Sequence, residues 1–467
     1  MIKKIYLIIL TIICFSILFS FVSIKRHENF QSQGCDLALY DQIIWLYSQG
    51  KRPYSTFVGR LDPADRFRPI LLFLVPFYWL KPDVKNLLIA QSIILASGIL
   101  PAFLLAQKVL KKFFVSYVIS LSYILFIGIQ SFIIDDFHEI VFLPPLLLWI
   151  VYFYFINKKK LFFLFLFLFL LVKEQAGFLL AFVSFYLLLF GRNKRSAFLS
   201  LIISLFWSIL IIWVVMPSFG EFSYVGFVKE NERLDKAIIN YLIEPLTILR
   251  NVATPVVKIK TIFISFAAFG FFPLFYPEIL IPVTYQFLSR FLDQLHSYRW
   301  TVNYHFSGEL ASLMIIGVIF AFKRISSLTS KPQKIINILS FMLLIAVIIE
   351  QLFLPVPLKN LLKKDFYKQP RGVNDIKLLL ESIPRENSIA TQNNLAPHLS
   401  QREKIYILPE GIGADLILID LRPNQDQWNF YTLSLREMKV LIDNLIEEKK
   451  YYILKEKNNC FLLRKNN

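Results

Sequence analysis

Long apolar segments alternate with short polar segments along most of this chain. A helix needs about 20 apolar residues to cross the hydrocarbon core of a bilayer, and repeated segments of that kind are typical of a polytopic membrane protein. The pattern therefore predicts an all-α membrane domain in residues 1–354 with about eleven crossings. The predicted crossings are 5–23, 84–107, 113–133, 140–156, 161–172, 175–190, 197–216, 257–273, 275–289, 308–322 and 335–354.

Two of these segments form a special case. Residues 161–172 would make a helix about 18 Å long, whereas the hydrocarbon core is about 30 Å thick. One continuous helix over 161–190 would instead place two basic loops on opposite sides of the membrane. We therefore expect two short helices that meet at Lys173 and Glu174, at or below the outer interface and beside a cavity in the protein.

Basic residues in the short loops predict the orientation. Such loops are enriched on the cytoplasmic side, and the opposing Lys25 and Arg26 are outnumbered by the later loops. The apolar run 5–23 lacks a small-residue cleavage site, so we interpret it as an uncleaved first helix rather than a signal peptide. An odd number of crossings then puts the N-terminus in the cytoplasm and the C-terminus outside. The cytoplasmic residues are Lys3, Lys4, Lys108, Lys111, Lys112, Lys158–Lys160, Arg192, Lys194, Arg195, Lys323, Arg324, Lys331 and Lys334.

The same topology predicts what lies on the outer side. In the first outer segment, residues 37–47 are amphipathic and predict a helix at the interface. Residues 355–467 are richer in charge and predict a small extracytoplasmic α/β domain, with strands at 388–391, 404–408, 415–420, 451–454 and 460–464 and helices at 375–383 and 434–448. The outer segments are 24–83, 134–139, 217–256, 290–307 and 355–467.

Composition agrees with a membrane protein, since 56% of the residues are hydrophobic and the mean hydropathy is +0.55. We attribute the net charge of +18 to the basic loops, as a topology signal rather than a sign of nucleic-acid binding. The three cysteines, Cys14, Cys35 and Cys460, have neither the spacing of a metal site nor that of a disulfide framework.

Acidic residues stand where the chain would leave the membrane on its outer side. Asp36 and Asp41 follow the first apolar segment. A carboxylate this close to hydrocarbon is costly, and its default interpretation is functional. Either residue could take a proton from an acceptor hydroxyl or help to hold a divalent cation. The alternatives are a helix cap for Asp36 and a solvated side chain for Asp41.

A denser cluster, Asp135, Asp136, His138 and Glu139, lies between the third and fourth apolar segments. Four potential ligands in so short a loop predict binding of a cation or of an acceptor. The candidate metal ligands are Asp36, Asp136, His138 and Glu139, and Mg²⁺ or Mn²⁺ is the expected ion, with no other cofactor. A tight polar turn is the alternative, although a turn does not require a histidine and three acids.

Candidate phosphate-binding residues come from several outer segments. Lys173 and Glu174 could form a self-neutralising ion pair, or Lys173 could meet a phosphate while Glu174 sets its position. Outer arginines suit a phosphate as well, although each is more often an interface anchor. The predicted donor-phosphate group is Lys173, Glu174, Arg66, Arg68, Tyr304 and His305, and the further outer arginines are Arg60, Arg290 and Arg299.

A polar loop follows the first predicted strand of the C-terminal domain. It contains Asn393, Asn394 and His398, at a position that is typical of a binding loop. A cap between a strand and a helix is the competing interpretation.

Short motifs stand in a definite order along the chain. They are Cys35-Asp36-Leu37-Ala38-Leu39-Tyr40-Asp41-Gln42, Arg66-Phe67-Arg68-Pro69, Phe137-His138-Glu139, Lys173-Glu174, Tyr304-His305, Gln392-Asn393-Asn394 and Pro397-His398-Leu399-Ser400. Together they resemble the DUF2079 family of bacterial and archaeal membrane proteins over nearly the whole chain. That family is grouped with the GT-C glycosyltransferase superfamily, which includes protein mannosyltransferases and lipid A aminoarabinose transferases.

The resemblance implies a GT-C-like helical bundle in the cytoplasmic membrane of a bacterium or archaeon. It implies a cell-envelope enzyme that moves a sugar from a polyprenyl-phosphate donor to a lipid, glycan or protein acceptor on the outer face. Asp36 would match the catalytic acid of the first outer loop, with Asp41 as a second candidate, and we expect inversion at the sugar carbon. One departure is Arg66-Phe67-Arg68-Pro69 where the family usually has His-Phe-Ser-Pro, which removes a histidine as a metal ligand.

Two other classes of function remain open from the residues alone. A transporter or flippase for a lipid-linked or anionic solute would also use Lys173, Glu174 and the outer arginines. It would predict polar residues at both ends of the bundle, whereas here they gather on one side. A non-catalytic sensor that uses the C-terminal domain would leave Asp36 and the 135–139 cluster unexplained.

Overall fold

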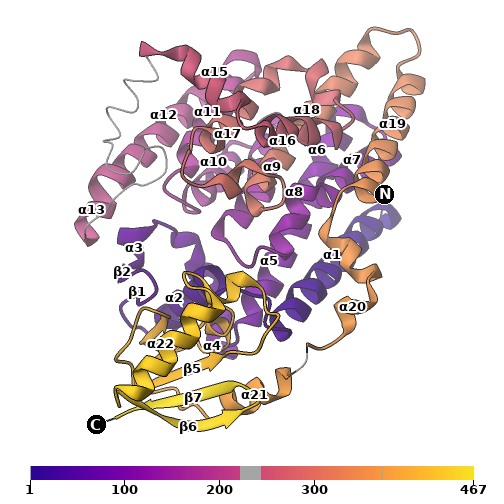
Figure 1. The fold of residues 1–467 in the computed structure, drawn as a ribbon. Helices are drawn as coiled ribbons and strands as arrows, with labels where there is room; N and C mark the ends of the chain where they lie inside the picture. The colour runs from indigo at the N-terminus through magenta and orange to yellow at the C-terminus, as the bar shows by residue number, and fades with distance from the viewer. Residues whose placement is uncertain (1, 221–242, 371, 467) are drawn as a thin grey trace.

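A computed structural model describes residues 2–220, 243–370 and 372–466 of the chain. A large helical part carries a small sheet at one end, built from the C-terminal residues, and α1 (Ile2–Glu28) runs toward that sheet (Figure 1). The predicted class, a mostly helical membrane protein with a small α/β unit near the C-terminus, is confirmed in this coarse form.

Each of the predicted apolar segments contains a helix. Apart from α1, these helices are α5 (Lys85–Ser97), α6 (Ile99–Leu110), α7 (Phe113–Leu125), α8 (Ile127–Gln130), α9 (Leu143–Phe155), α10 (Lys159–Leu170), α11 (Ala176–Phe190), α12 (Lys194–Leu210), α16 (Val256–Ala267), α17 (Leu280–Phe291), α18 (Gly308–Ser327) and α19 (Pro332–Phe353). The predicted outer segment 217–256 lies mostly outside the described residues.

Some of these helices are long enough to cross a membrane, and others are shorter. In the described part of the chain, five helical stretches are long and apolar enough to cross a membrane, or six if the pair Phe113–Leu125 and Ile127–Ile133, bent by 47°, counts as one span. The predicted number of about eleven is higher because it also includes helices such as Ala176–Phe190 that are too short to meet this criterion. The five are Ile5–Glu28, Lys85–Leu110, Lys194–Phe219, His305–Ser327 and Pro332–Phe353.

The predicted break at Lys173 and Glu174 is present, because α10 ends at Leu170 and α11 begins at Ala176. Beyond the break, α11 lies close against α12. A Cβ atom on Gly177 would come within 2.4 Å of the Ser204 carbonyl oxygen, and the hydroxyls of Ser184 and Ser200 are 2.5 Å apart. Small and hydroxyl-bearing residues allow helices to approach closely where lipid supplies no hydrophobic driving force.

The segment after α1 folds under the C-terminal sheet. It forms the short π-helix η1 (Gly34–Ala38) and then α2 (Leu39–Ser48), which largely confirms the helix predicted at 37–47. However, α2 is mostly buried instead of lying in a lipid interface, because the C-terminal part covers it. The Gln42 amide, for example, donates to the Arg402 carbonyl oxygen at 3.2 Å. The remaining elements of this region are β1 (Tyr54–Ser55), β2 (Arg60–Leu61), α3 (Asp62–Asp65), η2 (Pro69–Leu74) and α4 (Val75–Leu80).

The C-terminal residues form a mixed sheet with the strand order β4-β3-β5-β7-β6, and all the predicted strands are confirmed. β3 pairs in parallel with β4 and β5, whereas β7 pairs antiparallel with β5 and β6. The strands are β3 (Ile389–Thr391), β4 (Ile405–Ile407), β5 (Leu416–Asp420), β6 (Tyr451–Lys457) and β7 (Cys460–Lys465).

Alternation along β5 sends side chains to both faces of this sheet. Leu416 and Leu418 join a core with α21 (Val373–Glu381), and Ile417 and Ile419 join one with α22 (Leu435–Glu447). The core on the α21 side also contains Phe30 and Ala38, from the segment that follows α1. The C-terminal unit therefore completes one of its cores with the same segment that carries Asp36.

A candidate active site at the outer loops

Asp36 lies in η1, directly after the first helix, and 40% of its side chain is exposed. Its Oδ1 atom is 3.2 Å from Nε2 of His138. The backbone before it is held by Asn393, whose side-chain oxygen accepts hydrogen bonds from the Gly34 and Cys35 amides at 2.8 and 3.2 Å. The C-terminal unit thus positions the loop that presents this carboxylate.

Two stacked imidazoles connect Asp36 with Asp135. The rings of His138 and His305 lie 3.6 Å apart between centroids, with 29° between their planes. Asp135 accepts a hydrogen bond from the His305 backbone amide at 2.9 Å and another from the His305 ring. Burial alone would lower the pKa of His138, but the charge of Asp36 and its hydrogen bond raise it to about 9. His138 can therefore carry a positive charge and pair with the Asp36 carboxylate.

Asp136 points away from this group. Its backbone is left-handed (φ 57°), and its Oδ2 atom accepts a hydrogen bond from the Gln33 amide at 2.6 Å. Burial raises the pKa of Asp136 to about 7, although the nearby charge of Arg26, 3.7 Å away, opposes this effect. We assign Asp136 to the turn and to its attachment to α1, rather than to a ligand site.

Glu139 is the centre of a buried ionic network. Its Oε1 atom lies 3.2 Å from Nζ of Lys173, and its Oε2 atom lies 3.8 Å from Nη1 of Arg68 and accepts a hydrogen bond from Tyr40. Arg68 also binds Asp62 through Nη2 at 2.7 Å. Only 2% of the Glu139 side chain is exposed, so these cations are what makes its burial tolerable.

The suggested pairing of Lys173 with Glu174 does not form, because Lys173 faces Glu139 instead. Glu174 is buried and accepts a hydrogen bond from the Phe67 amide at 3.1 Å, which fixes the segment before Pro69. Lys173 keeps 25% of its side chain exposed, whereas Arg68 keeps 2%. Lys173 is therefore the cation of this network with room to meet a ligand.

The other predicted phosphate residues are less directly involved. Arg290 is buried and donates to the carbonyl oxygens of Arg299 and Thr301, at 2.9 and 2.8 Å, so it holds this loop in place. Arg66 donates to the Asp65 carbonyl oxygen, and Tyr304 stands edge-on to the Tyr298 ring. His305 joins the imidazole pair and not a cluster of cations.

Asp41 occupies a different place from Asp36. Its side chain is fully buried and accepts hydrogen bonds from the hydroxyls of Tyr78 and Ser400, the latter at 2.6 Å. Burial raises the pKa of Asp41 to about 6 in spite of these hydrogen bonds. Through its hydrogen bond with Ser400, Asp41 connects the segment that follows α1 to the C-terminal unit.

The predicted polar loop of the C-terminal unit also contacts the segment that follows α1. Besides its contacts to residues 34 and 35, Asn393 donates to the Gln33 side chain at 2.5 Å and to the Trp428 carbonyl oxygen at 3.0 Å. Asn394 donates to the Phe30 carbonyl oxygen at 3.2 Å, and the His398 ring stacks on His27. Asn393 and Asn394 thus bind the chain itself, close to Asp36.

Replacing Asn393 with alanine should loosen the loop around Asp36, because hydrogen bonds to three successive residues are lost. We expect maleimide to label the neighbouring Cys35 several-fold faster, in a Cys14→Ser background where the remaining Cys460 is buried. Asn444→Ala, at an exposed position on α22, is the matched control and should leave the rate unchanged. Equal labelling rates in the Asn393 variant and the wild type would contradict this positioning role.

Three residues have the arrangement of a metal site. Ligand atoms of Asp135, His138 and His305 all lie within 4.8 Å of one another. Nδ1 of His138 is buried and has no hydrogen-bond partner in the described part of the chain, which leaves it available as a ligand atom. The residues present therefore fit an ion. This set differs from the predicted one, since Asp136 faces Arg26 and Glu139 is held between two cations.

Sequence reasoning missed some members of these networks. Tyr40 and Asp62 were not selected, although both stand in the first outer segment, and both contact the Arg68 side chain. Asp62 follows the basic residue Arg60 and precedes a proline, which by itself indicates a helix start and no ligand role. His305 was predicted to bind phosphate. Its contact with Asp135 could not be predicted, because the two residues are 170 positions apart and only the fold brings them together.

The comparisons with known proteins agree with this fold. A family model described as "Predicted membrane protein (DUF2079)" matches residues 26–462. The chain belongs to the DUF2079 family. The resemblance stated from the motifs is thereby confirmed. No curated protein sequence matches the chain.

Solved structures share the DUF2079 chain's architecture at low sequence identity. ArnT from Cupriavidus metallidurans bound to undecaprenyl phosphate superposes with a TM-score of 0.53 and 9% identity, and the match covers 97% of each chain. ArnT from the same organism in the apo state gives a TM-score of 0.53 and 10% identity, again over 97% of each chain. At this identity the likeness shows an ArnT-like fold for nearly the whole chain.

Proposed function

We propose that this DUF2079 protein is a membrane glycosyltransferase that moves a sugar from a polyprenyl-phosphate donor to an acceptor on the outer face of the membrane. The observation that carries the proposal is the partly exposed Asp36 carboxylate, directly after α1 and hydrogen-bonded to His138. The ArnT-like fold supports it, since one solved ArnT structure holds undecaprenyl phosphate.

Asp36 would serve as the general base. It takes the proton of an acceptor hydroxyl as that oxygen attacks the anomeric carbon of the sugar. The new carbon–oxygen bond forms while the bond to the phosphate oxygen breaks, and polyprenyl phosphate leaves with the electron pair. A single direct displacement inverts the configuration at the sugar carbon. His138 pairs with Asp36 and orients its side chain before the reaction.

Lys173 would neutralise the phosphate of the donor. It is the partly exposed cation of the Glu139 network, and its pairing with Glu139 fixes its position. Arg68 is more deeply buried, so its part is to support Glu139 and Tyr40. The acceptor remains a lipid, a glycan or a protein, and the chemistry requires only a hydroxyl or amine nucleophile.

The orientation belongs to the same proposal. We infer about eleven crossings, in which the shorter helices are accommodated by local thinning of the bilayer or by neighbouring protein, with the N-terminus in the cytoplasm. Residues 1–354 then form the membrane domain, and residues 355–467 form an extracytoplasmic domain next to Asp36. This orientation is supported by the basic loops, which fall at the opposite ends of the helices from the Asp36 site in the predicted topology.

We also propose Zn²⁺, rather than Mg²⁺ or Mn²⁺, at Asp135, His138 and His305. Two imidazoles and one carboxylate are ligands that Zn²⁺ favours, whereas Mg²⁺ prefers oxygen atoms. When bound, the ion would supply positive charge for the donor phosphate. It would also require neutral imidazoles, so binding should release the His138 proton and weaken as the pH falls.

Replacing His305 with alanine should lower Zn²⁺ affinity by about 100-fold, because a ligand and the ring stacked on His138 are both lost. Calorimetry on the purified full chain at neutral pH measures this directly. His296→Ala is the control, since His296 pairs with Asp293 and is not part of the three-residue group. Equal Zn²⁺ affinities for the two variants, or no Zn²⁺ binding by the wild type, would contradict a metal site at these residues.

The glycosyltransferase proposal is tested with the purified protein in lipid and a panel of polyprenyl-phosphate sugars. Mass spectrometry of the lipid extract should detect free polyprenyl phosphate for at least one donor, together with a glycosylated acceptor. If every donor in the panel remains intact while the protein binds it, the proposal fails.

A further inference from the structure

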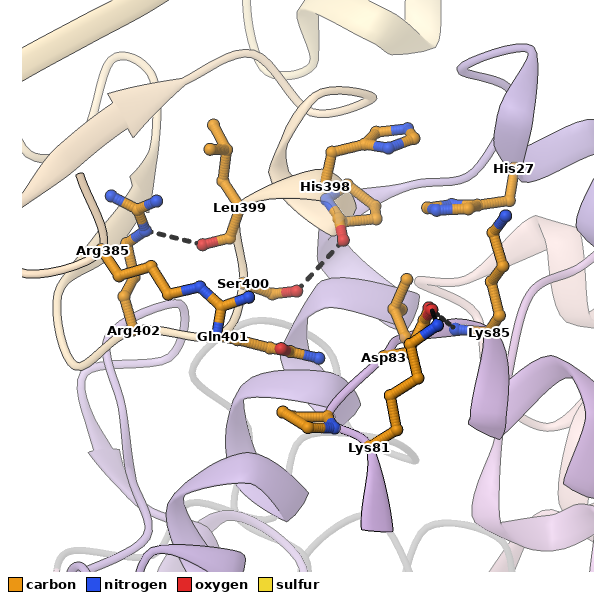
Figure 2. Close-up of a pocket in the computed structure, with 13 residues that line it drawn as sticks. His27, Lys81, Asp83, Lys85, Arg385, His398, Leu399, Ser400, Gln401 and Arg402 are labelled. Carbon is orange, nitrogen blue, oxygen red and sulfur yellow. Dashed lines mark hydrogen bonds and ion pairs between the residues drawn. The ribbon is translucent and has the colours of Figure 1, made fainter. Parts of the chain in front are cut away.

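A second polar site lies beside the C-terminal unit, separate from Asp36. It is a pocket of about 400 Å³ whose lining includes none of the residues around Asp36, Asp135 or Lys173 (Figure 2). Three parts of the chain meet there: the end of α1 with His27, the segment 81–85 that leads into α5, and the loop 397–402 with Arg385 nearby. The pocket thus spans the boundary between the helices and the sheet.

Cations outnumber carboxylates in this lining. Lys81, Lys85, Arg385 and Arg402 face a single acid, Asp83. Lys85 pairs with Glu28 outside the lining at 2.5 Å, and Lys81 lies 3.7 Å from Asp83. These contacts balance part of the charge and leave an excess of positive charge at the mouth of the pocket.

The two arginines differ in their freedom. Arg402 is held by the carbonyl oxygens of Leu399 and Asn387, at 2.8 and 3.0 Å. Burial and then the charge of Arg385 lower the pKa of Arg402 to about 10, which indicates that the two cations repel each other. Arg385 itself is exposed, and Figure 2 shows its side chain and that of Lys81 extending from different sides of the pocket.

Two histidines, His27 and His398, belong to the lining of the pocket. The His398 ring stacks on His27 with 4.1 Å between centroids, and burial lowers the pKa of His398 well below its usual value. Nε2 of His398 is buried and has no hydrogen-bond partner among the described residues. A buried polar atom of this kind is costly unless a ligand or water satisfies it.

We propose that this pocket binds a phosphate group, either in the head group of an anionic lipid or as a soluble phosphate. Several cations that approach from different sides suit a tetrahedral anion with several acceptor oxygens better than a planar carboxylate. The pocket stands at the outer ends of α1 and α5, where lipid head groups would lie. A bound phosphate would join α1, the 81–85 segment and the C-terminal unit, and it would therefore stabilise the docked arrangement that holds Asp36.

The test uses the purified full chain and a double variant, Lys81→Gln with Arg385→Gln. Both residues are exposed, so their replacement should leave the fold intact. Calorimetry with inorganic phosphate should show binding by the wild type that the double variant weakens about tenfold or more. The matched control is Arg436→Gln with Lys439→Gln, which removes the same charge from an exposed part of α22.

A lipid experiment separates the two sources of phosphate. The protein is placed in nanodiscs of phosphatidylcholine with a minority of phosphatidylglycerol, and native mass spectrometry counts the retained anionic lipid. If the wild type and the control retain phosphatidylglycerol but the pocket variant does not, the ligand is a lipid head group. If the pocket variant loses only the calorimetric binding of inorganic phosphate, the ligand is a soluble phosphate. If the two double variants behave alike in both experiments, the pocket is not a phosphate site, whatever the activity at Asp36.

Discussion

Asp36→Asn is expected to abolish sugar transfer while donor binding persists. Asparagine keeps the size of the side chain and a hydrogen-bond acceptor for His138, but it cannot take the acceptor proton. Loss of a general base costs typically about 10²–10⁴-fold in rate. Transfer is measured as polyprenyl phosphate released per chain, and binding as donor retained by the protein in native mass spectrometry.

The control for this variant is Asp443→Asn, on the exposed face of α22, which changes the same charge far from the loop in sequence and should retain wild-type turnover. Asp36→Glu adds a second check, because a carboxylate displaced by one methylene should recover part of the rate. Full activity in Asp36→Asn would exclude Asp36 as the base. Loss of donor binding together with activity would instead assign Asp36 to substrate binding.

Glu139→Gln is expected to destabilise the protein by about 3–5 kcal/mol, which is the usual cost of removing one partner from a buried ion pair. The substitution leaves Lys173 without its carboxylate partner, and Arg68, which has almost no access to water, keeps only Asp62. We expect a lower apparent Tm in detergent at a fixed scan rate, and loss of transfer because Lys173 is no longer held.

Glu278→Gln is the matched control for the Glu139 variant. Glu278 pairs with Arg324 in an ion pair whose arginine is 41% exposed, and exposed pairs contribute about 0–1 kcal/mol. The two substitutions are chemically identical and differ in burial. If both shift Tm equally, the Glu139 network does not stabilise the fold in the way described.

Local patterns were sufficient to predict the long helices and the C-terminal strands of this fold, but not the short β1 and β2. Apolar runs gave the helices, and the break between α10 and α11 followed from comparing their length with a bilayer. The strands of the C-terminal sheet were visible because most are short runs of β-branched, aromatic or other apolar residues in a more polar part of the chain. The burial of α2 could not be predicted in this way, since it depends on a unit that lies more than 300 residues later.

For the candidate site, too, the sequence predicted some features and not others. Asp36, the 135–139 cluster and Lys173 could be selected because charge beside hydrocarbon is unusual. The partners of these residues could not be predicted from the sequence. Lys173 pairs with Glu139 instead of the adjacent Glu174, and His305 contacts Asp135 from a segment 170 residues away in the chain. Asp41 and Asp136 share the chemistry of Asp36, and their burial and their hydrogen-bond partners give them different roles.

Following one donor lipid in sealed proteoliposomes distinguishes a glycosyltransferase from a transporter. A polyprenyl-phosphate sugar is placed in one leaflet, and both the lipid and its sidedness are analysed over time. For a glycosyltransferase with Asp36 as its base, we expect polyprenyl phosphate and a glycosylated acceptor to accumulate with wild-type protein and to be absent with Asp36→Asn. Intact donor that moves to the other leaflet, equally well with Asp36→Asn, would contradict this expectation and identify a transporter.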